Sequence, residues 1–337
     1  MKAMVLREHG GPEKLVYETS FPDPAIGEGD VLLRVRASSL NYHDIFTRRG
    51  MPGIKIAMPM IMGLDIAGEI AEVGPGVTGW QVGDRVLVDP ANRVEGGLMG
   101  ETAPGGLAEL CRVCAHQLIR LPDHVGFSEA AAIPVVYGTA IRMMHTIGQV
   151  EKDEKVLIIG ASGGVGVSCV QLAKLAGAFV IGCVSSGRKA EKLLVLGADH
   201  TIDYVKDDFV KEIFAHFGKP MRRGPGATNG VDVVVNYTGG DTWVKSLRCL
   251  RVGGRILTCG ATAGFNPVED LRYIWSFELQ IRGSNSYGRE DILKGLELVA
   301  SGRLKPHIDV VLPLEQAAEG MRRLEQREVF GKVVIVP

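Results

Sequence analysis

Four glycines at the start of a predicted helix form the pattern with the clearest chemistry. Gly160, Gly163, Gly164 and Gly166 follow an apolar strand expected at 156–159 and precede an apolar helical segment. Glycine permits a tight turn and close approach of backbone to a pyrophosphate, and a helix N-terminus supplies N–H groups and a positive dipole end. The pattern predicts a dinucleotide site formed by Gly160, Ser162, Gly163, Gly164, Val165 and Gly166. The alternative is a glycine-rich turn that binds nothing.

The end of the second predicted strand indicates which dinucleotide is bound. An NAD site usually has an Asp or Glu about 20 residues after the glycines. This chain instead has Ser185, Ser186, Arg188 and Lys189, with no acid before Glu191. Because hydroxyl groups and cations suit a 2′-phosphate that a carboxylate would repel, we predict NADPH as the cofactor. The alternative is that the two cations only begin a solvated helix.

The elements that must position these residues fall into two regions. Residues 1–125 have short strand patterns, such as 31–37 and 83–89, between Gly- and Pro-rich turns, which predict a small antiparallel β barrel or sandwich. From residue 126, apolar segments alternate with helical patterns, as in a doubly wound parallel sheet with crossover helices. The six strands are expected at 156–159, 179–183, 200–203, 231–235, 255–259 and 279–282.

A seventh apolar segment, 332–337, lies beyond these six. We expect it to return to the first domain, which then becomes discontinuous in sequence. The predicted domains are 1–125 with 300–337, and 126–299.

The composition excludes several classes of protein. The chain has 337 residues, of which 38 are Lys or Arg and 39 are Asp or Glu, so a net charge of −1 gives no field that would attract nucleic acid or a membrane surface. No segment resembles a signal peptide or a membrane span, and we expect a cytoplasmic protein. The six cysteines are scattered through mostly apolar segments, so we expect no disulfide framework.

Five sequence segments together resemble the medium-chain dehydrogenase/reductase superfamily: "LNYHDIFTRRG" (40–50), "GLDIAGEIAEVGPGV" (63–77), "GASGGVG" (160–166), "LGADHTIDY" (196–204) and "GKVVIV" (331–336). The resemblance covers essentially the whole chain and is strongest to the zinc-free, NADPH-dependent quinone oxidoreductase branch. It implies a six-stranded Rossmann domain and a GroES-like β-barrel domain, with the cofactor in a cleft between them. It also implies a homodimer.

The same resemblance bears on metal and on Asp65, an acid in the apolar run 61–70. Zinc-dependent members have Cys, Gly-His-Glu and a further Cys where this chain has Asn41, Leu64–Asp65 and the run 131–133. Because a tetrahedral catalytic site needs about three protein ligands, we expect no catalytic metal. Asp65 then becomes a cleft-facing or internally hydrogen-bonded acid, for which we favour a structural role.

One other pair of candidate metal ligands is Cys111 and Cys114. Residues three apart in a strand point to opposite faces, and there is no second pair of cysteines, so we expect no metal there either. The closely spaced cysteine quartet of structural zinc sites is also missing.

The resemblance also assigns roles to individual residues. Asn41 matches the residue that borders the nicotinamide ribose and substrate, and its amide could hydrogen-bond a ribose hydroxyl or a substrate oxygen. Asp44 completes the same motif and is expected to brace the turn that presents Asn41. Lys189 and Tyr204 match positions that hold the 2′-phosphate. The remaining expected cofactor contacts are Gly260, Ser284, Thr139 and Lys332.

The expected reaction is hydride transfer from NADPH to a quinone or to an activated enone or enoyl double bond, with a small hydrophobic or quinone-like substrate. Conjugation spreads the resulting charge, so a metal is not required. Some relatives carry a Tyr where this chain has Phe46, which has no proton to give. The candidate proton donors are Tyr42, His43, Tyr137 and Tyr287, together with bulk water.

Two other functions stay open from the sequence. One is an NADP-dependent alcohol dehydrogenase or carbonyl reductase that works without zinc or binds metal unconventionally. The other is an NADPH-binding protein with no enzymatic activity.

Overall fold

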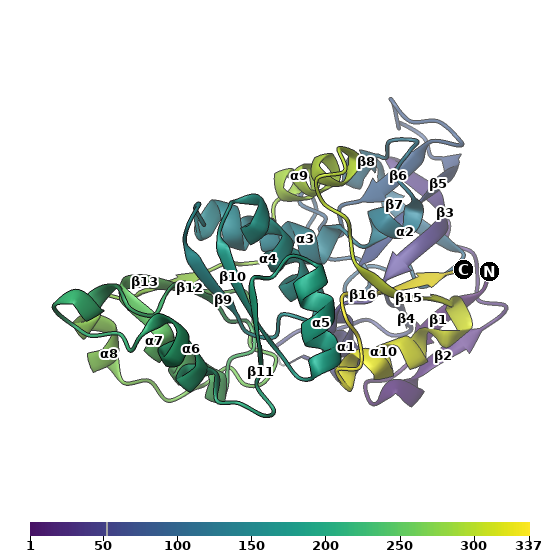
Figure 1. Cartoon of the computed structure of the whole chain (residues 1–337). Coiled ribbons are helices and arrows are strands. Elements are labelled where there is room, and N and C mark those ends of the chain that lie inside the picture. The colour runs from purple at the N-terminus through teal and green to yellow at the C-terminus, as the bar shows by residue number, and fades with distance from the viewer. Residues whose placement is uncertain (52) are drawn as a thin grey trace. The chain divides into compact units, whose positions relative to one another are not determined.

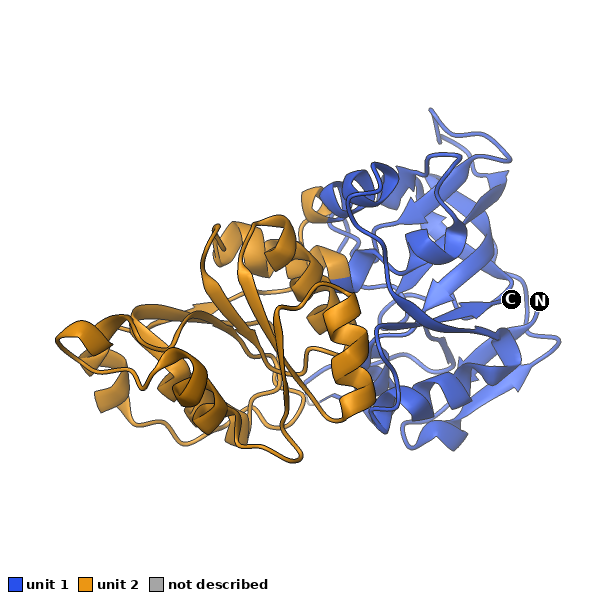
Figure 2. Ribbon diagram, in the orientation of Figure 1, with its two compact units in different colours: residues 1–136, 292–337 blue, residues 137–291 orange. Residues whose placement is uncertain are grey.

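The computed structural model describes residues 1–51 and 53–337. These form two compact units, one of residues 1–136 with 292–337 and one of residues 137–291 (Figure 2).

The second unit is built on a six-stranded parallel sheet in the order β11-β10-β9-β12-β13-β14 (Figure 1). The order reverses between β9 and β12, which is the switch point where doubly wound sheets bind ligands at the carboxyl ends of their strands. The strands are β9 (Lys155–Ile158), β10 (Phe179–Val184), β11 (His200–Asp203), β12 (Val231–Val235), β13 (Leu250–Thr258) and β14 (Gln280–Gly283).

The predicted doubly wound sheet is therefore confirmed. Its central strands are apolar because helices cover both faces: every residue of β12, Val-Asp-Val-Val-Val, is buried. The helices in this part of the chain are α4 (Gly164–Leu175), α5 (Gly187–Val195), α6 (Phe209–Phe217), η4 (Pro225–Thr228), α7 (Asp241–Cys249) and α8 (Leu271–Ser276). Three further helices precede or follow them: α3 (Pro134–Ile141), η3, a π-helix (Arg142–Ile147), and α9 (Arg289–Ala300).

The first unit contains two sheets. The larger has the order β15-β16-β3-β5-β6-β8, with β7 also paired to β3, and the smaller has the order β2-β1-β4 (Figure 1). The strands are β1 (Ala3–Leu6), β2 (Leu15–Glu18), β3 (Asp30–Ser39), β4 (Met60–Ile61), β5 (Asp65–Val73), β6 (Arg85–Val88), β7 (Leu110–Cys114), β8 (Leu118–Arg120), β15 (Ile308–Pro313) and β16 (Lys332–Val336). Short helices connect them: η1 (Pro12–Lys14), α1 (Tyr42–Arg49), η2 (Ala115–Gln117), α2 (Phe127–Ala131), η5 (Leu314–Gln316) and α10 (Ala317–Glu325).

Strand β3 organises this unit. Its alternating pattern buries Val31, Leu33, Val35 and Ala37, and exposes Arg34 and Arg36. β3 pairs antiparallel with β5 and with β7, and its last residues pair with the C-terminal strand β16. This return of the chain end to the first unit carries Lys332 to the end of β3, where the polar residues described below converge.

Among the described residues, none of the helices has the length and apolar character needed to span a membrane.

Candidate active site

Asp65, the acid inside the apolar run, has a hydrogen-bonding partner on each carboxylate oxygen. Oδ2 accepts from Ser39 Oγ at 2.7 Å, from Asn41 Nδ2 at 2.9 Å and from Lys332 Nζ at 3.3 Å. Oδ1 accepts from the backbone N–H of Val135 at 3.0 Å. The side chain is completely buried. Of the two alternatives for Asp65, the internally hydrogen-bonded acid is the one observed.

Lys332, at the start of β16, supplies the cation that pairs with this acid. Its Nζ donates to Leu40 O at 2.8 Å, to Asn41 Oδ1 at 2.7 Å and to Asp65 Oδ2 at 3.3 Å. Burial lowers the pKa of Lys332, and the nearby carboxylates oppose that shift. An ammonium has three donors, and all three have protein acceptors. Lys332 therefore holds Asn41 and Asp65 in place; that it also contacts the cofactor stays a prediction.

The amide of Asn41 is fixed in one orientation by these neighbours. Oδ1 accepts from Lys332, and Nδ2 donates to Asp65 Oδ2 and, at 3.3 Å, to Ser39 O. Both amide protons thus make hydrogen bonds within the protein. The second lone pair of Oδ1 is left to accept one further hydrogen bond. In this orientation the amide can accept from a hydroxyl group, such as that of a ribose, and its contact with a cofactor or substrate stays a prediction.

Asp44 braces the turn that presents Asn41, as predicted. At the start of α1, Asp44 Oδ2 accepts from the backbone N–H of Asn41 at 2.7 Å, and the backbone N–H of Asp44 donates to Asn41 O at 3.1 Å. Asp44 is fully buried, and desolvation raises its pKa to about 6. Within the described part of the chain, its other oxygen, Oδ1, has no hydrogen-bonding partner. Asp44 therefore acts on Asn41 through the backbone.

The remaining face of α1 carries Tyr42, His43 and Phe46, which are all partly exposed. The rings of Tyr42 and Phe46 meet edge to face, with centroids 5.2 Å apart. His43 Nε2 lies 2.5 Å from Oε2 of Glu101, whose side chain is 9% exposed. Glu101 was not singled out from the sequence, because 58 residues separate it from His43 and no local pattern marks it.

The glycine loop of the second unit makes a tight turn directly before α4. Gly160 has φ +74°, and Gly163 precedes the first residue of α4, where the helix N–H groups lack intrahelical partners. A Cβ on Gly166 would lie 2.6 Å from Gly160 O and 2.6 Å from the hydroxyl of Tyr237. This Tyr237 hydroxyl donates to Gly160 O at 2.7 Å. Tyr237 thus fixes the loop from the end of β12, a role that the sequence did not indicate.

The predicted 2′-phosphate residues lie at the carboxyl ends of β10 and β11, which are neighbours in the sheet. Ser185 and Ser186 follow β10, and Ser186 caps α5 by accepting from the backbone N–H of Lys189 at 3.4 Å. Arg188 is exposed, and Tyr204 is 37% exposed. The backbone N–H of Tyr204 donates to Val184 O at 3.0 Å, so the two strand ends lie side by side. Hydroxyl groups and cations gather at this edge.

The residues expected near the nicotinamide end lie at the carboxyl ends of β13 and β14. The backbone N–H of Ser284 donates to Thr258 O at 2.8 Å, which joins the two strand ends. Ser284 is 6% exposed, and its Oγ is without a hydrogen-bonding partner among the residues that the structure describes. Gly260 is exposed, just after β13. Thr139 lies in α3 and is 7% exposed.

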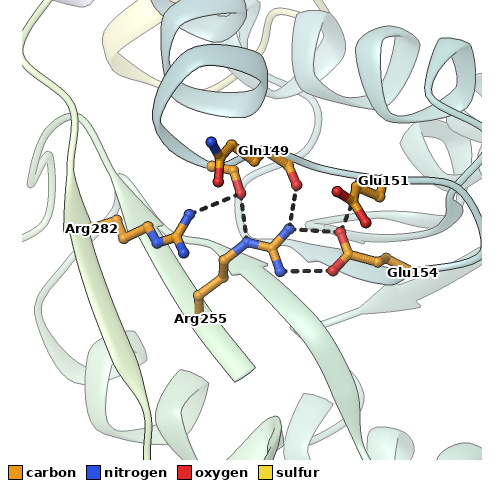
Figure 3. Close-up of a pocket in the computed structure, with 6 residues that line it drawn as sticks. Gln149, Glu151, Glu154, Arg255 and Arg282 are labelled. Atoms are coloured by element: carbon orange, nitrogen blue, oxygen red, sulfur yellow. Dashed lines mark hydrogen bonds and ion pairs between the residues drawn. The ribbon is translucent and has the colours of Figure 1, made fainter. Parts of the chain in front are cut away.

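A separate pocket of about 160 Å³ lies at the opposite edge of this sheet (Figure 3). It is lined by Gly148, Gln149, Glu151, Glu154, Arg255 and Arg282. The guanidinium of Arg255 forms a bidentate pair with Glu154, at 2.7 and 2.6 Å, and also donates to Gly148 O and Gln149 O. These bonds tie the end of the π-helix to β13, which makes the pocket a structural feature of the sheet's amino edge.

No group of three or more His, Cys, Asp or Glu side chains within residues 1–51 and 53–337 could hold a metal ion. Cys111 is buried in β7 and Cys114 is only partly buried, as expected for opposite faces of the strand. Burial raises the pKa of the Cys111 thiol to about 12.

Comparison with known proteins finds a family model for each of the two regions of the chain. The model of the alcohol dehydrogenase GroES-like domain matches residues 27–123, and that of the zinc-binding dehydrogenase matches residues 164–301. The acryloyl-coenzyme A reductase of Sulfurisphaera tokodaii is 32% identical, over 100% of both chains. The crotonyl-CoA reductase of Streptomyces collinus is 31% identical, over 96% of this chain and 82% of its own. A solved structure titled NAD-dependent alcohol dehydrogenase aligns with TM-score 0.90 at 35% identity, over 100% of both chains.

Proposed function

The chain belongs to the medium-chain dehydrogenase/reductase superfamily, and we propose that it is an NADPH-dependent, zinc-independent reductase of an activated carbon–carbon double bond. It is an oxidoreductase with a GroES-like domain and a Rossmann domain. The observation that carries the finer proposal is the buried cluster of Ser39, Asn41, Asp65 and Lys332, which takes up the segments where zinc-dependent members place ligands.

The second unit fits a phosphorylated dinucleotide. The start of α4 and the glycine loop would hold the pyrophosphate, because the close approach at Gly166 leaves no room for a side chain. Ser185, Ser186, Arg188, Lys189 and Tyr204 would hold the 2′-phosphate. The hydroxyl of Ser284, which has no hydrogen-bonding partner within residues 1–51 and 53–337, is available to the nicotinamide half. Bound NADPH supplies a hydride; the protein contributes orientation and polar contacts.

In the first unit, Asn41 presents an acceptor of fixed direction to a ribose hydroxyl, and Lys332 and Asp65 keep it there. A conjugated substrate suits a site with no Lewis acid, since its own π system carries the charge left by hydride addition. Two relatives whose names specify crotonyl-CoA and acryloyl-CoA reduction favour an enoyl thioester as the substrate. A quinone is the second substrate class we propose to test.

The experiment is a substrate screen with purified protein that follows the loss of NADPH absorbance. We expect turnover with short enoyl thioesters, less with quinones, and little with saturated aldehydes or alcohols. NADH in place of NADPH should raise KM. Turnover restricted to alcohols with NAD would instead favour an alcohol dehydrogenase, the activity named for the solved structure at 35% identity. Cofactor binding without turnover across all classes would favour a non-enzymatic role.

Two further parts of the proposal rest on the sequence resemblance, namely a homodimer and a cytoplasmic location. Light scattering at working concentration tests the first, with a mass near twice 36.2 kDa expected. Cell fractionation tests the second.

A further inference from the structure

We propose that His43, positioned by Glu101, donates the proton that completes reduction of the double bond. The inference rests on the proposed function and names a residue for its second step. Hydride addition to the β-carbon of an enoyl thioester leaves an enolate, and the α-carbon of that enolate needs a proton.

The buried tyrosines of the second unit are poor sources of this proton. Tyr137 is 1% exposed, and its hydroxyl accepts from Gln171 Nε2 at 3.0 Å. Tyr287 is 5% exposed. Tyr237 donates its proton to Gly160 O, and burial raises the pKa of this phenol well above its ordinary value. Each hydroxyl is enclosed by protein or committed to the fold.

The partly exposed face of α1 leaves two candidates, Tyr42 and His43. Both follow Asn41, the residue whose free lone pair faces a hydroxyl-bearing ligand in the proposed function. Phe46, one turn further on, lies on the same helix face and contacts Tyr42. The face thus combines two aromatic rings with one imidazole. Histidine is the side chain whose ordinary titration range lies nearest neutral pH, whereas a phenol releases its proton far less readily.

Glu101 distinguishes His43 from a surface histidine. Its carboxylate is enclosed, with the side chain 9% exposed, and lies 2.5 Å from His43 Nε2. A buried carboxylate needs a hydrogen-bond donor, and the donor to Glu101 is the ring nitrogen Nε2 of His43. The contact fixes both the ring orientation and the nitrogen that faces inward, as a carboxylate does for the imidazole of a catalytic dyad. Nδ1 of His43 is the ring nitrogen left for another partner. The next charged side chain along α1, Asp44, is turned to Asn41.

The step balances without a further reagent. As the hydride forms a C–H bond at the β-carbon, the π electrons move to the α-carbon and thioester oxygen. The enolate then takes the proton from Nδ1 of the His43 imidazolium, so that an α C–H bond forms and the N–H bond breaks. The electron pair of that bond stays on the ring, which becomes neutral. Solvent reprotonates the ring before the next turnover.

The test compares His43→Gln with His216→Gln, the matched control, in D2O with NADPH and crotonyl thioester. His216 is an exposed histidine of α6 that also lies beside a glutamate, Glu212. The wild type should place one deuterium at the α-carbon in a single configuration. For His43→Gln we expect kcat to fall about 100-fold, a burst of one NADPH oxidised per site before a slow phase, and deuterium in both configurations. A purely structural role would produce neither the burst nor the loss of configuration. His216→Gln should keep the wild-type rate and configuration, and Tyr42→Phe shows whether the phenol supplies the proton instead.

Glu101→Gln is the second variant, because it replaces the carboxylate that positions His43 and keeps the imidazole. We expect kcat to fall about 10-fold with KM nearly unchanged, and partial loss of configuration. His43→Gln that retains the rate and the single configuration overturns the proposal, as does Tyr42→Phe that loses them instead. These outcomes leave the proposed function intact. Failure of the wild type to oxidise NADPH with any enoyl thioester contradicts the proposed function itself, and the proposal about His43 with it.

Discussion

The glycine loop of the second unit and the polar cluster of the first unit, which are the two proposed ligand-binding features, are built in opposite ways. The loop is local: seven consecutive residues, 160–166, make the turn, and the helix that follows supplies the N–H groups. The cluster is assembled from β3, β5, β16 and the start of α1, and Lys332 and Asp65 are 267 residues apart. The loop depends on the missing side chain at Gly166, whereas the cluster depends on four side chains that hydrogen-bond one another. A change in the loop should therefore alter binding first, and a change in the cluster should alter folding first.

The largest effect expected from this difference is at Lys332. Replacing it by Met leaves the buried carboxylate of Asp65 without its cation, which should lower the free energy of unfolding by about 3–5 kcal/mol. Urea denaturation measures this change. The double variant Asp65→Asn with Lys332→Met removes both charges and should recover part of the loss. A single variant as stable as the wild type would show that the pair is not a structural unit.

Asp44 gives the cluster a pH dependence. Its pKa is raised from 3.8 in the unfolded chain to about 6 in the folded protein, so the folded state holds this proton more tightly. The resulting stabilisation is fully present below pH 3.8 and is lost as the pH rises through 6. Relative to Asp44→Asn, the wild type should lose on the order of 3 kcal/mol across that window. Denaturation of both proteins at several pH values measures it, and a constant difference would contradict the raised pKa.

The loop makes the contrasting prediction. Gly166→Ala places a methyl group 2.6 Å from Gly160 O and from the Tyr237 hydroxyl, which should cost about 1–3 kcal/mol of stability and weaken NADPH binding. Gly163→Ala is the matched control for strain, because its Cβ would lie 3.7 Å from Gly160 O. We expect Gly163→Ala to keep the wild-type Tm. Calorimetry of folding and of NADPH binding separates the two effects, and equal Tm values for both variants would contradict the close packing at Gly166.

The smallest effect concerns the 2′-phosphate. Replacing Arg188 and Lys189 by Gln should raise KM for NADPH about 10-fold, since charge-assisted hydrogen bonds to a phosphate are lost. KM for NADH should stay unchanged, because that cofactor has no 2′-phosphate. Steady-state kinetics with both cofactors checks this prediction. Equal changes in KM for NADPH and NADH would mean that these cations do not bind the 2′-phosphate.

The same contrast explains what could be predicted from the sequence. The six strands and the glycine turn can be predicted from the sequence, because each depends on a pattern of apolar or turn-forming residues within a few neighbouring positions. An apolar run around Asp65 signalled that this acid needs partners. The partners themselves could not be predicted, since Lys332, Glu101 and Tyr237 reach their sites through strand pairing and loops over 58 to 267 residues. For the same reason, the contact between Lys332 and Asp65 could not be predicted from the sequence.

The central claim is that hydride moves to a conjugated carbon acceptor without help from a metal ion. Its most direct test is the rate of crotonyl thioester reduction by NADPH, measured on metal-analysed protein before and after exhaustive chelation. The account predicts no stoichiometric metal and an unchanged kcat. Tightly bound zinc whose removal abolishes turnover, and whose return restores it, would contradict the account.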